Sequence, residues 1–228
     1  MPSSVSDQIP LIMKVVVEMA ERQQGPLRIL DCGIGNGRYG VLIRDTLDVF
    51  HQREHWRNTI DGIESFSAYI TPVHRYVYSS IREANIVDVL PSMTDNEYDL
   101  ALMIDVIEHF DRSRGDEVLH QLTRVAKVCV IATPQSFFEQ GEVHGNAAEV
   151  HRSVWSEAAF SSFSSRVTSL STIVQVIMVL GGPEQLHQSL RKWRLRQRIR
   201  ALLPIKLGAY IFERRERRQG RRGAKATK

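Results

Sequence analysis

The sequence is poor in cysteine and has no long hydrophobic run, and each absence argues against a class of protein. It contains two cysteines in 228 residues, Cys32 and Cys129, without the paired spacing of a metal site. A disulfide-stabilised domain is therefore not expected, and we expect both thiols to be reduced. No apolar run reaches the roughly 18 residues that a membrane-spanning helix needs, and no secretory signal is recognisable at the start. We therefore expect a cytoplasmic protein.

Acidic residues are almost missing from residues 188–228. This segment holds 15 of the 30 Lys and Arg residues but only Glu213 and Glu216 among the acids, so its formal charge is +13 and that of residues 1–187 is −9. The rest of the composition, with 43% hydrophobic and 25% charged residues, is that of an ordinary globular protein. The length suits one α/β domain with a substantial core.

The stretch LRILDCGIGNGRYG, residues 27–40, combines a short apolar strand, a glycine turn and the start of a helix. The strand enters Asp31, and Gly33, Gly35 and Gly37 alternate across the turn. Glycine suits such a turn because it accepts a positive φ and lets a ligand approach the backbone. In an α/β sheet this arrangement opens a pocket at the carboxyl edge.

The spacing of the glycines indicates which ligand the turn binds. A dinucleotide fingerprint, G-x-G-x-x-G, needs a third glycine where this chain has Arg38, which disfavours a nicotinamide oxidoreductase. The pattern D-x-G-x-G-x-G instead resembles the first motif of class I S-adenosylmethionine (SAM) dependent methyltransferases. The resemblance implies SAM as cofactor and an α/β fold. That fold is a Rossmann-like, doubly wound sheet of seven mostly parallel strands with an antiparallel last strand and helices on both faces.

Further motifs follow in the order that this family requires. TIDGIESF predicts a second strand ending at Glu64, whose carboxylate would accept hydrogen bonds from the ribose hydroxyls. Asn85 and Ile86 stand where the family has its adenine contacts, although Asn85 replaces the more usual Asp. YDLALMID is an apolar strand that ends at Asp105. The resemblance therefore implies the following cofactor-binding residues: Asp31, Gly33, Gly35, Glu64, Asn85, Ile86 and Asp105.

Alternating strand and helix patterns extend the sheet over most of the chain. An N-terminal helix is expected within 1–25, and the methyltransferase domain over 26–181. A basic helical insertion, 182–205, then precedes the last strand of the sheet, 206–214, and a disordered basic tail, 215–228. The earlier strands are predicted at 27–31, 59–64, 82–86, 98–104, 128–132 and 172–180.

The acceptor side of the pocket is expected to carry a general base. His109 is the best candidate, because the unperturbed pKa of histidine is near neutral. The alternative is that His109 only caps the pocket or bonds the backbone.

A metal site is a further alternative at the same place. D-x-x-E-H resembles E-x-x-E-H, with which some methyltransferases hold a divalent metal. Here Asp105, Glu108 and His109 would share one helical face, completed by His144 or His151. Asp has a shorter reach than Glu, and Glu-His is also common in metal-free relatives. We therefore predict no metal.

A loop of 19 residues, 134–152, is expected to cross the mouth of the pocket. Its length favours a function over a plain connection. The pattern N-x-x-E-x-H-R-S-x-W, which begins in this loop, is similar to one in bacterial and archaeal methyltransferases of small molecules. We expect substrate contacts from His144, Asn146 and His151, with the alternative that His151 bonds the loop backbone.

The segment 186–222 predicts a basic amphipathic helix followed by a cationic tail. Three interpretations stay open: the solvated face of a packed helix, peripheral contact with an anionic membrane at its inner face, and contact with nucleic acid. Nucleic acid is the least favoured, because Trp193 is the only aromatic residue interleaved with the arginines of the helix.

Together these features predict a SAM-dependent methyltransferase that acts on an oxygen or nitrogen of a small molecule or of a glycan or lipid-linked intermediate. Two alternatives stay open. The basic tail suggests an RNA methyltransferase, but the N/D-P-P-Y motif of amino-methylating nucleic-acid enzymes is missing after the strand at 98–104. A SAM-binding protein without turnover is disfavoured by the complete set of acids and glycines.

Overall fold

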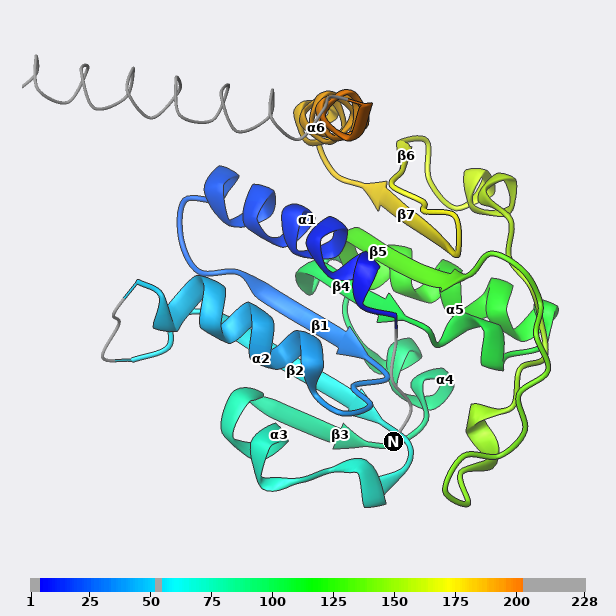
Figure 1. The fold of residues 1–228 in the computed structure, drawn as a ribbon. Helices are drawn as coiled ribbons and strands as arrows, with labels where there is room; N and C mark the ends of the chain where they lie inside the picture. The colour runs from blue at the N-terminus through cyan, green and yellow to red at the C-terminus, as the bar shows by residue number, and fades with distance from the viewer. Residues whose placement is uncertain (1–4, 52–54, 203–228) are drawn as a thin grey trace, which may run out of the picture. The chain divides into compact units, whose positions relative to one another are not determined.

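The computed structural model describes residues 5–51 and 55–202 (Figure 1). The chain divides into two compact units, with the boundary between His187 and Gln188. The first unit contains the sheet, and the second contains the greater part of helix α6, Glu184–Leu202. No helix in the described part of the chain is long and apolar enough to cross a membrane.

The first unit is built on one sheet of seven strands, in the order β3-β2-β1-β4-β5-β7-β6. The first five of these run parallel, whereas β7 runs antiparallel to both of its neighbours. The predicted fold class, a mostly parallel seven-stranded sheet with an antiparallel last strand, is confirmed. The strands have these bounds: β1 Arg28–Cys32, β2 Thr59–Glu64, β3 Ser80–Glu83, β4 Tyr98–Ile104, β5 Ala126–Pro134, β6 Val167–Ser169 and β7 Gln175–Gly181.

Helices cover both faces of the sheet (Figure 1). Three helices pack together on one face: α1 Ile9–Arg22, α2 Arg38–Arg44 and α3 Pro72–Val77. Two lie on the other: α4 Ile86–Val89 and α5 Arg112–Val125. α1 is amphipathic, since Ile12, Val15, Val16 and Met19 are buried at helical spacing. Because both faces are covered, β4 is buried along its whole length.

The parallel strands end at one edge of the sheet. Cys32 at the end of β1 lies opposite Ile63 of β2 and Met103 of β4, and Met103 lies opposite Ile131 of β5. The turns that follow these strands are therefore neighbours in space, although they are far apart in the sequence. This register brings the predicted cofactor residues to one place.

The C-terminal strands differ from the sequence-based prediction. The segment predicted as the sixth strand is β7, the antiparallel one, and the short edge strand β6 was not predicted. Three residues are too few for a pattern of alternation to be recognised. The strand expected at 206–214 and the basic tail, 215–228, both lie outside the described residues. Helix α6 lies within the segment predicted as helical, 182–205, but its apolar residues do not gather on one face, so the predicted amphipathic character is wrong. Its contacts with membranes or nucleic acid stay a prediction.

A buried arginine ties the end of α2 to the end of α3 and to the segment before β2. Arg44 donates from Nη1 to Asp48 (2.7 Å) and to the carbonyl of Asn58 (2.8 Å). Its Nε and Nη2 both donate to the carbonyl of Val77, at 3.1 and 2.7 Å. The guanidinium also lies 4.2 Å from the centre of the Trp56 ring. Both charged side chains of the pair are almost completely buried.

Replacing this arginine should destabilise the fold strongly. Arg44→Ala would break the buried ion pair with Asp48, and breaking a buried ion pair in this way costs about 3–5 kcal/mol. Urea unfolding followed by circular dichroism measures the free energy of unfolding. Arg75→Ala is the control, because the Arg75–Glu83 pair is exposed and such pairs contribute about 0–1 kcal/mol. Equal losses in the two variants would contradict the role given to Arg44.

Candidate cofactor and acceptor site

A cavity of about 1070 Å³ opens at the carboxyl edge of the sheet. All seven residues predicted to bind the cofactor line it. His109, Asn146 and His151 from the predicted acceptor side line it as well. His144 does not: its side chain is exposed, on a turn where its φ is +52°. All the site residues predicted from the sequence, except His144, therefore line the cavity.

The glycine turn after β1 has the backbone that its sequence indicated. Gly33, Gly35 and Gly37 have φ values of +76°, +51° and +77°. The N–H of Gly33 donates to the carbonyl of Ile63 at 2.9 Å, which fixes the turn on β2. A Cβ on Gly33 would come within 2.5 Å of the Val106 side chain. The turn thus needs glycine both for its backbone angles and for its packing.

Glu64 closes the glycine turn from the end of β2. Its carboxylate accepts hydrogen bonds from the N–H of Gly35 (3.0 Å) and of Phe66 (2.9 Å). Burial raises the pKa of Glu64, and these two bonds oppose the rise. The carboxylate therefore stands at the cavity wall, held by two backbone donors. It has further lone pairs with which to accept bonds from a ligand.

Asp31 lies at the end of β1 and is almost completely buried. The Tyr78 hydroxyl donates to its Oδ2 at 2.6 Å. Burial raises the pKa of Asp31 from 3.8 to about 7; the bond from Tyr78 opposes this rise and the nearby Glu64 adds to it. A carboxylate in this position is costly to ionise, and a cationic ligand would offset that cost.

Asn85 and Ile86 form the opposite side of the cofactor region. Asn85 caps α4, and its Oδ1 accepts a hydrogen bond from the N–H of Val87 at 3.2 Å. Asn is among the preferred residues at this cap position. The cap orients the Asn85 side chain at the cavity, and Ile86 provides a buried apolar surface beside it.

Asp105 follows β4 with a φ of +53°, which few residues other than glycine adopt. Its N–H donates to the carbonyl of Ala132 on β5 at 2.8 Å. Its Oδ2 accepts a hydrogen bond from Gln8, which precedes α1, at 2.9 Å. The alternative in which Asp105, Glu108 and His109 share one helical face is therefore wrong. The helical turn begins only at Ile107, so Asp105 leaves the strand in a different direction.

The turn Ile107–His109 places two side chains on the acceptor side of the cavity. Burial raises the pKa of Glu108 well above its usual range, and the charge of Asp105 adds to the rise. Burial and the neighbouring His151 lower the pKa of His109 to about 4. At neutral pH His109 is thus an uncharged imidazole, and a weaker base than the unperturbed value suggested.

His151 meets this turn from the 134–152 loop. The rings of His109 and His151 are 5.1 Å apart between centroids, and His151 lies edge-on to Phe138 at 4.4 Å. Asn146, also from the loop, is buried; it accepts from the N–H of Ala148 and contacts Glu149 at 3.4 Å. The loop therefore forms part of the cavity wall, as predicted from its length.

Three residues at the site were not predicted. Tyr78, which holds Asp31, follows α3 with no local motif that would mark it. Gln8, which holds Asp105, is a polar residue just before an amphipathic helix. Glu149 lies 3.9 Å from Nε2 of His109 and was already present in the N-x-x-E-x-H pattern. Only Glu149 carried a signal that sequence reasoning could have used.

Solved structures resemble this fold, although no family model and no curated protein matches the sequence. The bifunctional kinase-methyltransferase WbdD aligns with a TM-score of 0.57 at 15% identity, over 78% of this chain and 40% of its own. CurJ carbon methyltransferase aligns with a TM-score of 0.55 at 12% identity, over 74% and 52%. Magnesium protoporphyrin IX methyltransferase (ChlM) from Synechocystis PCC 6803, solved with bound SAM, aligns with a TM-score of 0.51 at 12% identity, over 78% and 85%.

The chain has the Rossmann-like fold that these solved methyltransferases share. What it shares with these proteins is the Rossmann-like sheet with its helices, and it spans only 40% of the length of WbdD. The cavity of this fold lies where ligands bind in open α/β sheets, outside the carboxyl ends of the strands.

Proposed function

We propose that the protein is a SAM-dependent methyltransferase. The observation that carries the proposal is the meeting of Asp31, the glycine turn and Glu64 with Asn85 and Asp105 around one cavity. Two acids at the ends of neighbouring strands suit a ligand that has both a cationic group and vicinal hydroxyls. SAM has both. Glu64 would accept hydrogen bonds from the ribose, and Asp31 would face the cationic methionine part.

The acceptor in this proposal is an oxygen or nitrogen of a small molecule or of a glycan or lipid-linked intermediate. Because SAM already carries an activated methyl group, the enzyme has mainly to position the acceptor, and positioning alone lowers a barrier by about 7–11 kcal/mol. The acceptor side of the cavity combines polar groups, His109, Asn146 and His151, with the apolar Phe137 and Phe138. Such a wall suits an acceptor of mixed polarity.

Transfer of labelled methyl groups tests the proposed reaction. Purified protein is incubated with methyl-labelled SAM and with separate small-molecule, lipid and RNA fractions of a cell extract. We expect label in the small-molecule or lipid fraction. Label in RNA alone would favour the alternative of an RNA methyltransferase. SAM binding without label in any fraction would favour a SAM-binding protein without turnover.

Glu64 should be needed for cofactor affinity. Hydrogen bonds to a charged group contribute about 1.5–3 kcal/mol, so Glu64→Ala should weaken SAM binding by roughly 10- to 150-fold. Glu83→Ala is the matched control, since Glu83 ends the neighbouring strand β3 but does not line the cavity. Isothermal calorimetry measures both. Equal SAM affinity in the two variants would refute the role of Glu64.

A further inference from the structure

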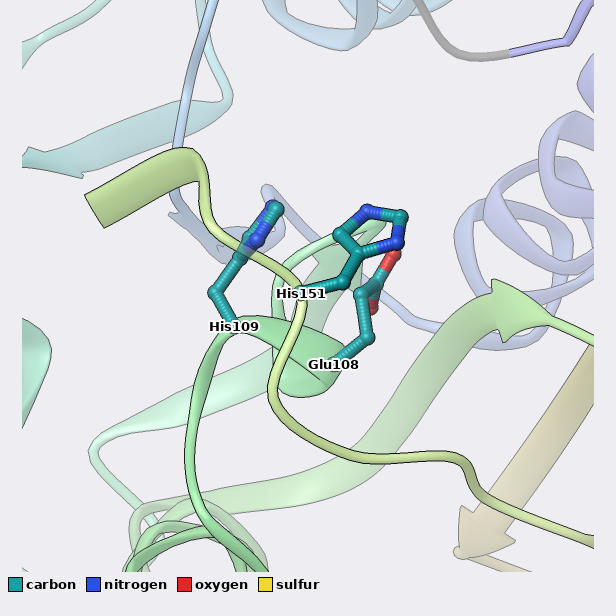
Figure 2. A group of neighbouring side chains, drawn as sticks. All are labelled: Glu108, His109 and His151. Carbon is teal, nitrogen blue, oxygen red and sulfur yellow. The ribbon is translucent and has the colours of Figure 1, made fainter. Parts of the chain in front are cut away.

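Three side chains with metal-binding groups meet on the acceptor side of the cavity. Glu108, His109 and His151 each offer a ligand atom, and these atoms all lie within 4.8 Å of one another. Figure 2 shows the imidazole of His151 beside the carboxyl group of Glu108, with His109 on the same turn as Glu108. None of the three belongs to the residues proposed to bind SAM.

Both imidazoles are oriented by backbone carbonyls. Nδ1 of His151 lies 3.0 Å from the carbonyl of Phe138, and Nδ1 of His109 lies 3.4 Å from the carbonyl of Val150. A carbonyl can only accept, so His151 carries its proton on Nδ1 and its lone pair on Nε2. His109 bonds the backbone of both Val150 and Asp105. A bond from the second ring nitrogen to a backbone carbonyl is the usual support of a metal-binding histidine.

The carboxyl group of Glu108 is buried and poorly satisfied by its neighbours. The residue is 2% exposed, and neither carboxyl oxygen makes a hydrogen bond of acceptable geometry with the described residues, although the Thr133 side chain is close enough to oppose the rise of its pKa. A buried carboxyl group without partners is costly, and such groups are usually paired or coordinate a metal. A cation bound to the Glu108 carboxyl group would offset the free-energy cost of burying it.

The backbone holds the two halves of the cluster together. The N–H groups of Arg152 and Ser153 donate to the carbonyl of Glu108 at 2.8 and 3.1 Å. The guanidinium of Arg152 donates to the carbonyl of His109 at 2.7 Å. The loop that carries His151 is thus fastened to the turn that carries Glu108 and His109, so the three ligands are positioned before a cation binds.

We infer that Glu108, His109 and His151 bind a divalent transition-metal ion of the Zn²⁺ type. Two imidazoles and one carboxylate suit Zn²⁺ and its neighbours, whereas Mg²⁺ and Ca²⁺ prefer oxygen ligands. At metal–ligand distances of about 2.0–2.2 Å, the ligand atoms of a tetrahedral site lie roughly 3.3–3.6 Å apart. The ligand atoms here lie within 4.8 Å of one another, so binding requires side-chain movements of up to roughly 1.5 Å. A metal site here departs from the prediction of no metal made from the sequence. Its ligand set also differs from the alternative considered with that prediction, because Asp105 is not part of it.

The position of the ion gives it a role at the acceptor. All three ligands line the same cavity as Glu64 and the glycine turn. A bound cation would hold and polarise an oxygen of the acceptor, which favours a hydroxyl-bearing acceptor over an apolar one. This role rests on the proposed function, whereas binding of the ion does not.

Metal titration of the full-length protein, prepared without a histidine tag and stripped with a chelator, tests the inference. We expect one equivalent of Zn²⁺ to bind in calorimetry, without displacement by excess Mg²⁺. Removing a second-shell group typically weakens metal affinity 10- to 100-fold, so loss of a ligand in His151→Ala or Glu108→Gln should weaken it at least about tenfold. His144→Ala, which changes an exposed histidine of the same loop, should leave the affinity unchanged.

Circular dichroism checks that each variant is folded, and His151→Ala serves if the buried Glu108→Gln does not fold. Absence of Zn²⁺ binding by the wild-type protein, or equal losses in His144→Ala and His151→Ala, would overturn the inference. SAM titration of the same sample separates this result from the proposed function. Zn²⁺ binding without SAM binding would refute only the latter, and SAM binding without Zn²⁺ binding would refute only the metal site.

Discussion

Asp31→Asn should make the protein more stable at about pH 8 and should weaken SAM binding at least tenfold. The carboxyl group of Asp31 is buried, and its pKa rises from 3.8 to about 7 on folding. Above pH 7 Asp31 is ionised in both the folded and the unfolded protein, but only in the folded protein is its charge buried, which is unfavourable. A rise of about three pKa units corresponds to roughly 4 kcal/mol. Asparagine has the same shape, removes the charge and can still accept from Tyr78.

The pH dependence of this gain has a defined sign. The folded state holds the Asp31 proton more tightly than the unfolded state, so between about pH 4 and pH 7 the wild-type protein loses stability as the pH rises. The advantage of Asp31→Asn should grow over the same interval and stay constant above it. Asp61→Asn is the control, because Asp61 also accepts from a tyrosine hydroxyl, that of Tyr98 at 3.0 Å, but is only partly buried.

Denaturant unfolding at about pH 5 and about pH 8 measures this difference. A gain for Asp31→Asn that is larger at the higher pH, together with lost SAM affinity, is the expected result. A variant less stable than the wild type at the higher pH would contradict the electrostatic account of Asp31. The two effects together would show a group kept for its ligand at the expense of stability, as is common at functional sites.

Gly35→Ala should impair SAM binding in a protein that still folds. Gly35 lines the cavity, has a φ of +51°, and an added Cβ would meet no protein atom within 4 Å. The left-handed backbone costs alanine about 1–2 kcal/mol. The added methyl group would also occupy space that a bound cofactor needs against the turn. We expect a loss of SAM affinity of tenfold or more.

Gly25→Ala is the matched control for this test. Gly25 also has a positive φ, +133°, and open space around its Cβ position, but it lies between α1 and β1 and does not line the cavity. Its replacement should reduce the melting temperature and leave the dissociation constant for SAM unchanged. Gly33→Ala is less informative, because its Cβ would strike Val106 and disturb the fold itself. Equal SAM affinity in Gly25→Ala and Gly35→Ala would argue against a cofactor on the turn.

The central strands could be predicted because each is a continuous apolar run and is bounded by polar turn residues. The predicted strand at 98–104 has the bounds of β4, since a fully buried parallel strand is a continuous apolar run between polar turns. The direction of β7 could not be read from its composition, because parallel and antiparallel core strands use the same residues. The three-residue β6 is defined only by its pairing with β7.

The cofactor side of the site was predictable for a geometric reason, and the acceptor side was less so. The carboxyl ends of parallel strands lie at one edge of the sheet regardless of the conformation of the loops. Asp31, Glu64 and Asp105 therefore had to be neighbours. The loop residues depend on tertiary contacts. His151 reaches the cavity because the following backbone bonds Glu108, whereas His144 falls on an exposed turn. The pKa of His109 likewise follows from its burial, which the sequence does not reveal.

Calorimetric titration of the purified protein with SAM, S-adenosylhomocysteine and NADH is the most direct test of the account. We expect SAM and S-adenosylhomocysteine to bind with micromolar dissociation constants, about −8 kcal/mol, at one site per chain. NADH should not bind, because Arg38 stands where a dinucleotide turn needs glycine. Absence of SAM binding, or binding of NADH in its place, would contradict the assignment of this cavity.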